Sequence, residues 1–124
     1  MRYLLDSNIV IAALIGEDTE LRQRMAEAAE DDFGISSIAY AEVAHGSIRG
    51  KPPSFQLLSR FVAKVPVLAF DTDAARAYAT LSFKRKSYDR LIAAHGLSRG
   101  LILVTDNESD FADVPGLKVE NWIK

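Results

Sequence analysis

The sequence of 124 residues contains no cysteine. This absence excludes disulfides, thiolate nucleophiles and cysteine-ligated zinc, and it leaves carboxylates and two histidines for chemistry. The chain also has no apolar run near the roughly 20 residues that span a bilayer. Asp6 interrupts the apolar core that a secretion signal would need. We therefore expect a cytoplasmic protein with no membrane partner.

Excess positive charge is missing as well. The net charge is −2 and the isoelectric point is near 5.6. This balance does not favour nucleic-acid binding through the field of the whole molecule. A cluster of acids concentrates negative charge locally, and a bound divalent cation cancels part of it. The positions of the charges therefore carry more information than their sum.

Strand-like and helical patterns alternate along the chain. Apolar runs rich in β-branched residues predict strands at 2–5, 33–36, 65–69, 101–104 and 117–121. Helical patterns lie between them, at 7–15, 18–30, 37–49, 54–64, 72–83 and 88–99. This alternation indicates an α/β protein with a parallel sheet covered on both faces. The length and the lack of a linker predict one domain over residues 1–124.

Acids stand at the borders of several apolar segments. Asp6 and Asp106 each follow a predicted strand, Glu42 lies in the segment after the second strand, and Asp89 opens the helix at 88–99. Acids beside buried strand ends are costly unless they hold a cation or a partner. The carboxyl ends of parallel strands are also where α/β proteins bind ligands. The pattern predicts a shared Mg²⁺ or Mn²⁺ site, although spacing alone does not establish convergence.

Each of these polar residues also has a purely structural explanation. Asp6 and Asp89 suit helix N-termini, where an acid caps the helix or interacts with its dipole. Glu42 suits an exposed helix face. Turn and capping chemistry accounts for the polar residues after the fourth strand, which are Asp106, Asn107 and Asp110.

Several motifs in order resemble one family. The matching segments are 3–9, 35–42, 88–95, 103–107 with 110–111, and 114–122. Together they resemble the PIN-domain family, in particular the VapC-type ribonuclease toxins of type II toxin-antitoxin systems. The resemblance implies a PIN-like three-layer α/β/α sandwich with a mostly parallel sheet of about five strands. It also implies a metal-dependent endoribonuclease that hydrolyses RNA phosphodiester bonds.

The resemblance assigns roles to individual residues. It makes Asp6, Glu42 and Asp89 both catalytic residues and ligands of Mg²⁺ or Mn²⁺, with Ser7 and Asn8 supporting the first acid. Partners implied by the resemblance are an RNA substrate, a cognate VapB-like antitoxin whose peptide inserts near the acids, and a second copy in a homodimer.

The fourth acidic position departs from the family pattern. Many members have an acid two residues after the threonine, where this chain has Asn107. We take Asn107 as a fourth catalytic residue and its neighbour Asp106 as a fourth metal ligand, with Asp110 as the other candidate. The choice among them, and between one and two metal ions, stays open.

Basic and aromatic residues near the motifs are candidates for RNA contacts. The predicted substrate-binding residues are Ser7, Asn8, Arg90 and Lys86. Basic residues 84–86 flank Asp89, and Arg49 and Lys51 follow the Glu42 helix; they would hold an RNA backbone without reading its sequence, or else be ordinary solvated charges.

Two aromatic residues and both histidines can be explained by structural roles instead of functional ones. Tyr88 and Trp122 could stack on bases, although core or interface packing is the favoured explanation for both. His45 stands three residues after Glu42, but a single Glu-x-x-His is poor support for a metal site. His95 in an alanine-rich helix is interpreted as a packing residue or as a residue that supports a metal ligand from behind.

Two other functions remain open. The first is a catalytically weak interaction module that keeps the fold. Asn107, where many family members have an acid, is the feature that supports this alternative. The second is a phosphotransferase with Asp6 as nucleophile, although Asn8 stands where that chemistry usually has a second acid.

Overall fold

A parallel sheet forms the centre of the molecule. The computed structural model describes residues 1–16, 18–82 and 87–123, and within them five strands pair in the order β3-β2-β1-β4-β5. All neighbouring strands are parallel. The strands are β1 (Tyr3–Leu5), β2 (Phe33–Ser36), β3 (Val67–Leu68), β4 (Ile102–Val104) and β5 (Val119–Glu120). The expected α/β class, strand count and pairing direction are confirmed.

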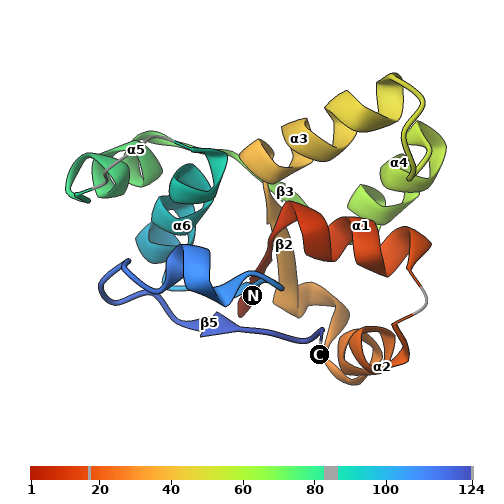
Figure 1. The fold of residues 1–124 in the computed structure, drawn as a ribbon, viewed down its shortest axis with the longest axis horizontal. Helices are drawn as coiled ribbons and strands as arrows, with labels where there is room; N and C mark the ends of the chain where they lie inside the picture. The colour runs from red at the N-terminus through yellow and green to blue at the C-terminus, as the bar shows by residue number, and fades with distance from the viewer. Residues whose placement is uncertain (17, 83–86, 124) are drawn as a thin grey trace.

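Helices cover the sheet on both sides. They are α1 (Ser7–Ile15), α2 (Thr19–Glu27), α3 (Ser37–Ile48), α4 (Phe55–Lys64), α5 (Thr72–Ala79) and α6 (Tyr88–Arg99). Figure 1 shows α1 to α4 on one side of the sheet and α5 with α6 on the other. This arrangement follows from right-handed crossovers, because the chain moves outward from β1 to β3 and then returns past β1 to β4. The expected three-layer sandwich is confirmed.

Short polar side chains begin the helices at the carboxyl ends of the strands. Asp6 accepts a hydrogen bond from the Ser7 amide, and Ser36 accepts one from the Ile38 amide. Each satisfies a backbone donor that the first turn of a helix leaves unpaired. The strands therefore pass directly into helices, and the residues at these junctions lie together at one edge of the sheet.

Two helices are shorter than the sequence predicted. Helix α2 ends at Glu27, and a short 3-10 helix, η1 (Glu30–Asp32), leads into β2. Helix α5 ends at Ala79, because the Thr80 hydroxyl and amide both bond to the Ala77 carbonyl and close the last turn. The prediction of a helix up to residue 83 is wrong for residues 80–82, which are not helical, and residue 83 lies outside the described residues.

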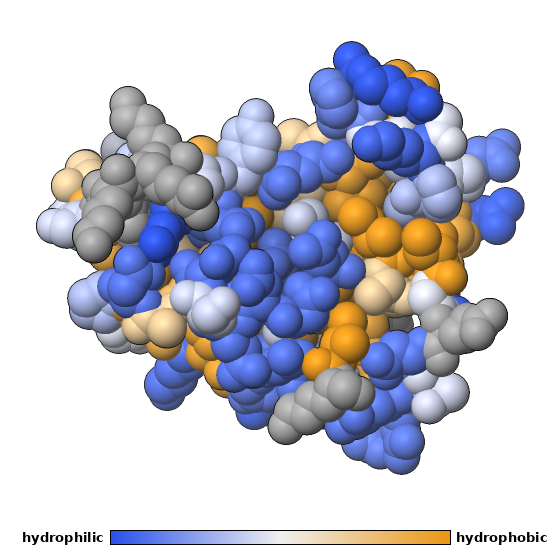
Figure 2. Space-filling model, in the orientation of Figure 1, coloured by the Kyte–Doolittle hydropathy of each residue, from blue (hydrophilic) through white to orange (hydrophobic). Residues whose placement is uncertain are grey.

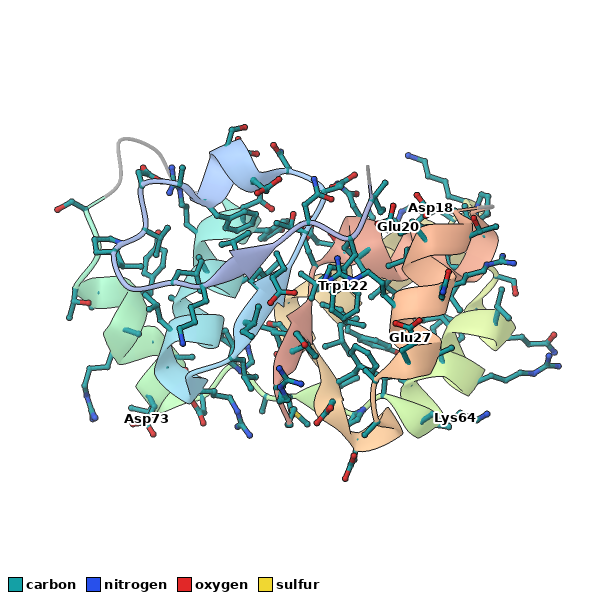
Figure 3. The ribbon with its side chains drawn as sticks, turned by 90° about the horizontal axis from the view of Figure 1, so that it is seen from below. Asp18, Glu20, Glu27, Lys64, Asp73 and Trp122 are labelled. Atoms are coloured by element: carbon teal, nitrogen blue, oxygen red, sulfur yellow. The ribbon has the colours of Figure 1, made fainter. Side chains whose placement is uncertain are left out.

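An aromatic cluster anchors the last strand to the first two. The Trp122 ring packs edge-on against Tyr3 at 4.9 Å and against Phe33 at 5.9 Å, and only 2% of its surface is exposed. Its Nε1 donates to Glu120 at 2.9 Å, and the Arg24 guanidinium of α2 lies over the ring. In Figure 3, Trp122 lies inside the molecule beside α2. Core packing is therefore the role of Trp122.

The surface carries both polar and apolar areas. Figure 2 shows hydrophilic residues gathered over the middle of one face and apolar residues over α1 and α4. Among the helices that the structure describes, none combines the length and the apolar character needed to cross a bilayer.

Candidate active site

The acidic residues meet where three adjacent strands end. Leu5 of β1 stands in register with Ile35 of β2 and Val104 of β4. The residues that follow Leu5 and Val104 are Asp6 and Thr105, so these two emerge at the same edge of the sheet. This is the edge at which parallel α/β sheets bind ligands.

Asp6 is the most buried of the acids. Its side chain is 3% exposed; Oδ1 accepts from the Ser7 amide at 2.7 Å and Oδ2 accepts from the Thr105 hydroxyl at 2.8 Å. Burial raises the pKa of Asp6, and these hydrogen bonds offset part of the rise. The carboxylate is thereby held in one orientation. With both oxygens engaged by donors, Asp6 is poorly placed for nucleophilic attack, which counts against the phosphotransferase alternative.

Glu42 lies on α3, and its carboxyl group interacts electrostatically with those of Asp6 and Asp89. Burial, followed by the charges of Asp6 and then Asp89, raises the pKa of Glu42 to about 7, against a partial lowering by a hydrogen bond from Ser7. Its Oε1 atom is buried without a hydrogen-bond partner among the described residues. A buried carboxylate oxygen with no donor is costly, so this atom is suited to a cation or to a donor from a ligand.

Asp89 lies in the first turn of α6, close to both other acids. Burial raises its pKa first, then the charges of Asp6 and Asp110, then a hydrogen bond with Asp110, while Arg90 lowers it. The neighbouring carboxyl group of Asp110 thus disfavours the charged form of Asp89. The sequence-predicted acids Asp6, Glu42 and Asp89 are thus brought into one electrostatically coupled group.

Three residues are candidates for the fourth acidic position of the site. Asp110 lies in the 3-10 helix η2 (Glu108–Phe111) and contacts Asp89, and the Asn107 side-chain amide donates to its Oδ2. Asp106 is exposed and acts on Asp6 as a neighbouring charge that raises its pKa. Asp110 thus acts on Asp89 and Asp106 acts on Asp6, and the Asn107 side chain orients Asp110.

The predicted substrate-binding residues are arranged differently from one another. Ser7 is buried against Asp6, whereas Asn8 is exposed at the start of α1. The Arg90 guanidinium forms a two-point ion pair with Asp113, whose second contact is 3.0 Å long. Lys86, with the rest of the basic run 84–86, lies outside the described residues. A role for these side chains in RNA binding stays a prediction.

The donor set fits a divalent cation. The described residues contain no three acidic or histidine side chains already grouped as a ligand shell. Mg²⁺ nevertheless needs few protein ligands, because water and substrate phosphate complete its octahedron. Burial, and after it the charges of neighbouring acids, raise the pKa values of these three acids, and Glu42 Oε1 has no donor among the described residues; a cation would offset both effects. All donors are oxygens, as Mg²⁺ and Mn²⁺ prefer.

Sequence reasoning missed the part played by Thr105. Its side chain is fully buried, its hydroxyl donates to Asp6, and the Asn107 amide donates to its Oγ1 at 3.1 Å. The signal was a threonine directly after a buried strand that neighbours β1. Without the strand order, this position could not be connected with Asp6.

The histidines and Tyr88 have distinct environments. His95 is fully buried, with Nδ1 2.8 Å from the Ser36 hydroxyl and its ring edge-on to Phe70, as expected of a packing residue. His45 lines a hollow beside Glu42. Tyr88 is 62% exposed at the start of α6, so the core-packing explanation is wrong for it, whereas interface packing stays a prediction.

Comparisons with known proteins agree over nearly the whole chain. The family model for the PIN domain matches residues 3–117. The tRNA(fMet)-specific endonuclease VapC of Salmonella typhimurium is 31% identical, over 98% of this chain and 98% of that protein. Ribonuclease VapC2 of Haemophilus influenzae is 29% identical over 99% of each. The VapBC2 crystal structure from Rickettsia felis, bound to a promoter DNA fragment, is similar with a TM-score of 0.87 and 26% identity, over 98% of this chain and 99% of that one.

Proposed function

This chain belongs to the PIN-domain family, in its VapC group, and from that membership we propose that it is the endoribonuclease toxin of a toxin-antitoxin pair. The observation that carries the proposal is the coupled group of Asp6, Glu42 and Asp89 at the carboxyl edge of the sheet. Curated relatives of similar length are ribonucleases. The reaction is hydrolysis of an RNA phosphodiester bond.

Each acid has a distinct task in this proposal. Asp6, oriented by Thr105 and the Ser7 amide, is a fixed ligand for Mg²⁺ or Mn²⁺. Glu42 would offer the unpaired Oε1, and Asp89 would offer its carboxylate from the first turn of α6. When bound, the cation supplies a Lewis acid that stabilises the charge developing on the phosphate and activates the attacking water.

The fourth position is assigned to the Asn107 and Asp110 pair. Asp110 extends the negative group beyond Asp89, and the Asn107 amide fixes its carboxylate. Asp106, exposed beside Asp6, contributes charge and remains the alternative ligand. An amide at 107 therefore supports an acid rather than replacing one.

The proposed protein partner is a VapB-like antitoxin. Several similar solved structures are complexes of VapC with VapB, such as that from Rickettsia felis. An inhibitory peptide that presents an arginine to the carboxylates would compete with the cation for the same charges. We also propose that the chain forms a homodimer and acts in the cytoplasm as a single domain.

The first test is cleavage of total bacterial RNA by the purified protein free of antitoxin. We expect discrete fragments with Mg²⁺ or Mn²⁺ and none with EDTA. Asp6→Ala and Asp89→Ala should abolish cleavage and growth arrest without unfolding the protein, because each removes one of several repelling carboxylates. The matched control is Glu27→Gln, which changes an exposed acid on α2 (Figure 3). Cation binding without cleavage would instead favour the interaction module.

A further inference from the structure

Tyr88 is a large aromatic residue left in solvent beside the acids. Its ring is 62% exposed, whereas Tyr3, Phe33, Phe111 and Trp122 are buried. It is the first residue of α6, and Asp89 follows it directly. A ring that contributes little to the core at this position is available to a ligand.

The ring borders a hollow that the acidic group shares. This hollow, of about 400 Å³, is lined by Ile38, Ala41, Glu42, His45 and Tyr88. Its size is at the lower end of the range for small-molecule sites. Glu42 forms one wall of this hollow. If an RNA phosphate is held at the acids, the nucleotide next to that phosphate therefore lies at the hollow. A second hollow, lined in part by Tyr78, Ser87 and Leu91, also has Tyr88 as a wall.

The lining combines an apolar wall with a hydrogen-bond donor. Arg49 lies 3.1 Å from His45 Nδ1, and a guanidinium can only donate, so Nδ1 is the acceptor. In the neutral ring the proton is then on Nε2, which can donate to a base edge or a phosphate oxygen. Ile38 and Ala41 offer the apolar surface that a flat ring covers.

We propose that Tyr88 is a stacking platform for an unpaired nucleobase next to the scissile phosphate, with His45 donating a hydrogen bond to that nucleotide. The inference rests on the proposed ribonuclease function, since the shared Glu42 wall connects the platform to the phosphate site. Aromatic stacking accepts any base, and it requires that base to be out of a duplex. The substrate class is therefore single-stranded or loop RNA, read at this position by shape more than by sequence.

The test measures binding, so that it does not depend on turnover. A fluorescein-labelled single-stranded RNA of nine nucleotides is titrated with protein in Ca²⁺, and a gel confirms that the RNA stays intact. A second set of oligonucleotides carries one abasic site at each position in turn. The proteins compared are wild type, Tyr88→Phe, Tyr88→Ala, His45→Ala and Phe55→Ala. Phe55 is the matched control, because it is 43% exposed and lies at the start of α4.

We expect Tyr88→Ala to weaken binding of intact RNA roughly 5- to 150-fold, the range for loss of one stacked base. Tyr88→Phe and Phe55→Ala should stay near the wild-type affinity, since the first keeps the ring and the second lies elsewhere. For the oligonucleotide whose abasic site replaces the stacked base, wild type and Tyr88→Ala should have equal affinity, because that RNA has no base to stack on the ring. His45→Ala should weaken binding less than Tyr88→Ala.

Two results would overturn the platform. The first is wild-type affinity of Tyr88→Ala for intact RNA. The second combines two observations on Tyr88→Ala: the same loss of affinity for the RNA with an abasic site at any position, and altered self-association in sedimentation velocity. That result would assign this face to a second copy of the chain. Failure of the wild type to cleave RNA in Mg²⁺ or Mn²⁺ counts against the proposed function, whereas the binding comparison still decides the platform.

Discussion

The Thr105 hydroxyl donates a hydrogen bond of 2.8 Å to Asp6 Oδ2, which joins two residues 99 positions apart in the chain. Thr105 in turn accepts from the Asn107 amide, so its hydroxyl hydrogen is directed at the acid. The contact lowers the pKa of Asp6 against the effect of burial, which raises it. A neutral side chain thus helps to keep a buried carboxylate ionised.

Replacing Thr105 with valine should impair the site without changing its shape. The methyl group occupies the place of the hydroxyl, and Asp6 loses a donor, so its pKa rises further. We expect kcat/KM at neutral pH to fall about 10-fold and the acidic limb of the pH–rate profile to move to higher pH. Thr105→Ser keeps the hydroxyl and should retain both the rate and the profile. Equal losses in the two variants, with no movement of the limb, would assign Thr105 a packing role.

The cation-free protein should lose stability as the pH rises, because the pKa of Glu42 is raised from 4.5 to about 7. The folded state binds this proton more tightly than the unfolded state, so ionisation penalises folding progressively from about pH 4.5 to 7. Allowing for solvent screening of a half-buried group, we expect about 1–2 kcal/mol. The measurement is urea unfolding in EDTA at pH 5 and pH 8.

The matched variant for this prediction is Glu42→Gln, which should remove that part of the pH dependence. His95 acts in the opposite sense: burial lowers its pKa, so it costs stability as the pH falls below its ordinary 6.5. The difference between wild type and Glu42→Gln cancels the His95 contribution. A difference that does not change between pH 5 and 8 would contradict the assigned coupling of Glu42 to its neighbours.

The fourth position can be decided by comparing two neighbouring acids. Asp110 contacts Asp89, whereas Asp106 is exposed. We expect Asp110→Asn to lower kcat/KM by about 10-fold or more and to weaken Mn²⁺ binding, whereas Asp106→Asn should change each by less than about threefold. Isothermal titration with Mn²⁺ and steady-state cleavage measure the two effects. The reverse ranking would assign the ligand role to Asp106.

Trp122 should contribute strongly to stability and little to chemistry. Its ring packs on Tyr3 and Phe33, and Arg24 contributes a contact over the ring with an ion pair to Glu120 at 3.5 Å. We expect Trp122→Ala to cost about 3–5 kcal/mol and Arg24→Ala about 1 kcal/mol or less. Urea unfolding followed by circular dichroism gives both values. Comparable small losses in the two variants would show that the aromatic cluster is not the anchor of the last strand.

The sequence pattern was sufficient for the elements of the fold. Each predicted strand overlaps an observed one, and most helix starts agree within a residue, because capping side chains such as Ser36 and Asp71 mark them locally. Helix ends were less predictable. The hydrogen bonds that end α5 at Ala79 compete with continuation of the helix. The difference in free energy between the two is too small to be predicted from local composition.

The site was only partly predictable, for a different physical reason. The motifs identify Asp6, Glu42 and Asp89, but the buried donor to Asp6 depends on which strand lies beside β1. The choice between Asp106 and Asp110 depends on how η2 turns after β4. The exposure of Tyr88 depends on which other elements of the fold pack beside it. These are properties of the neighbours in space, and a single sequence does not encode them in local patterns.

The position of β1 in the sheet governs when activity can arise during synthesis. The first strand made lies at the centre, between β2 and β4, and the register partner of Leu5 on one side is Val104. A growing chain on the ribosome carries Asp6 and Glu42 early, whereas Asp89 and then Thr105, with the strand that supports it, follow only later. The nascent polypeptide therefore lacks a finished acidic site until β4 and Thr105 have been made, so the proposed RNA cleavage would begin only late in synthesis.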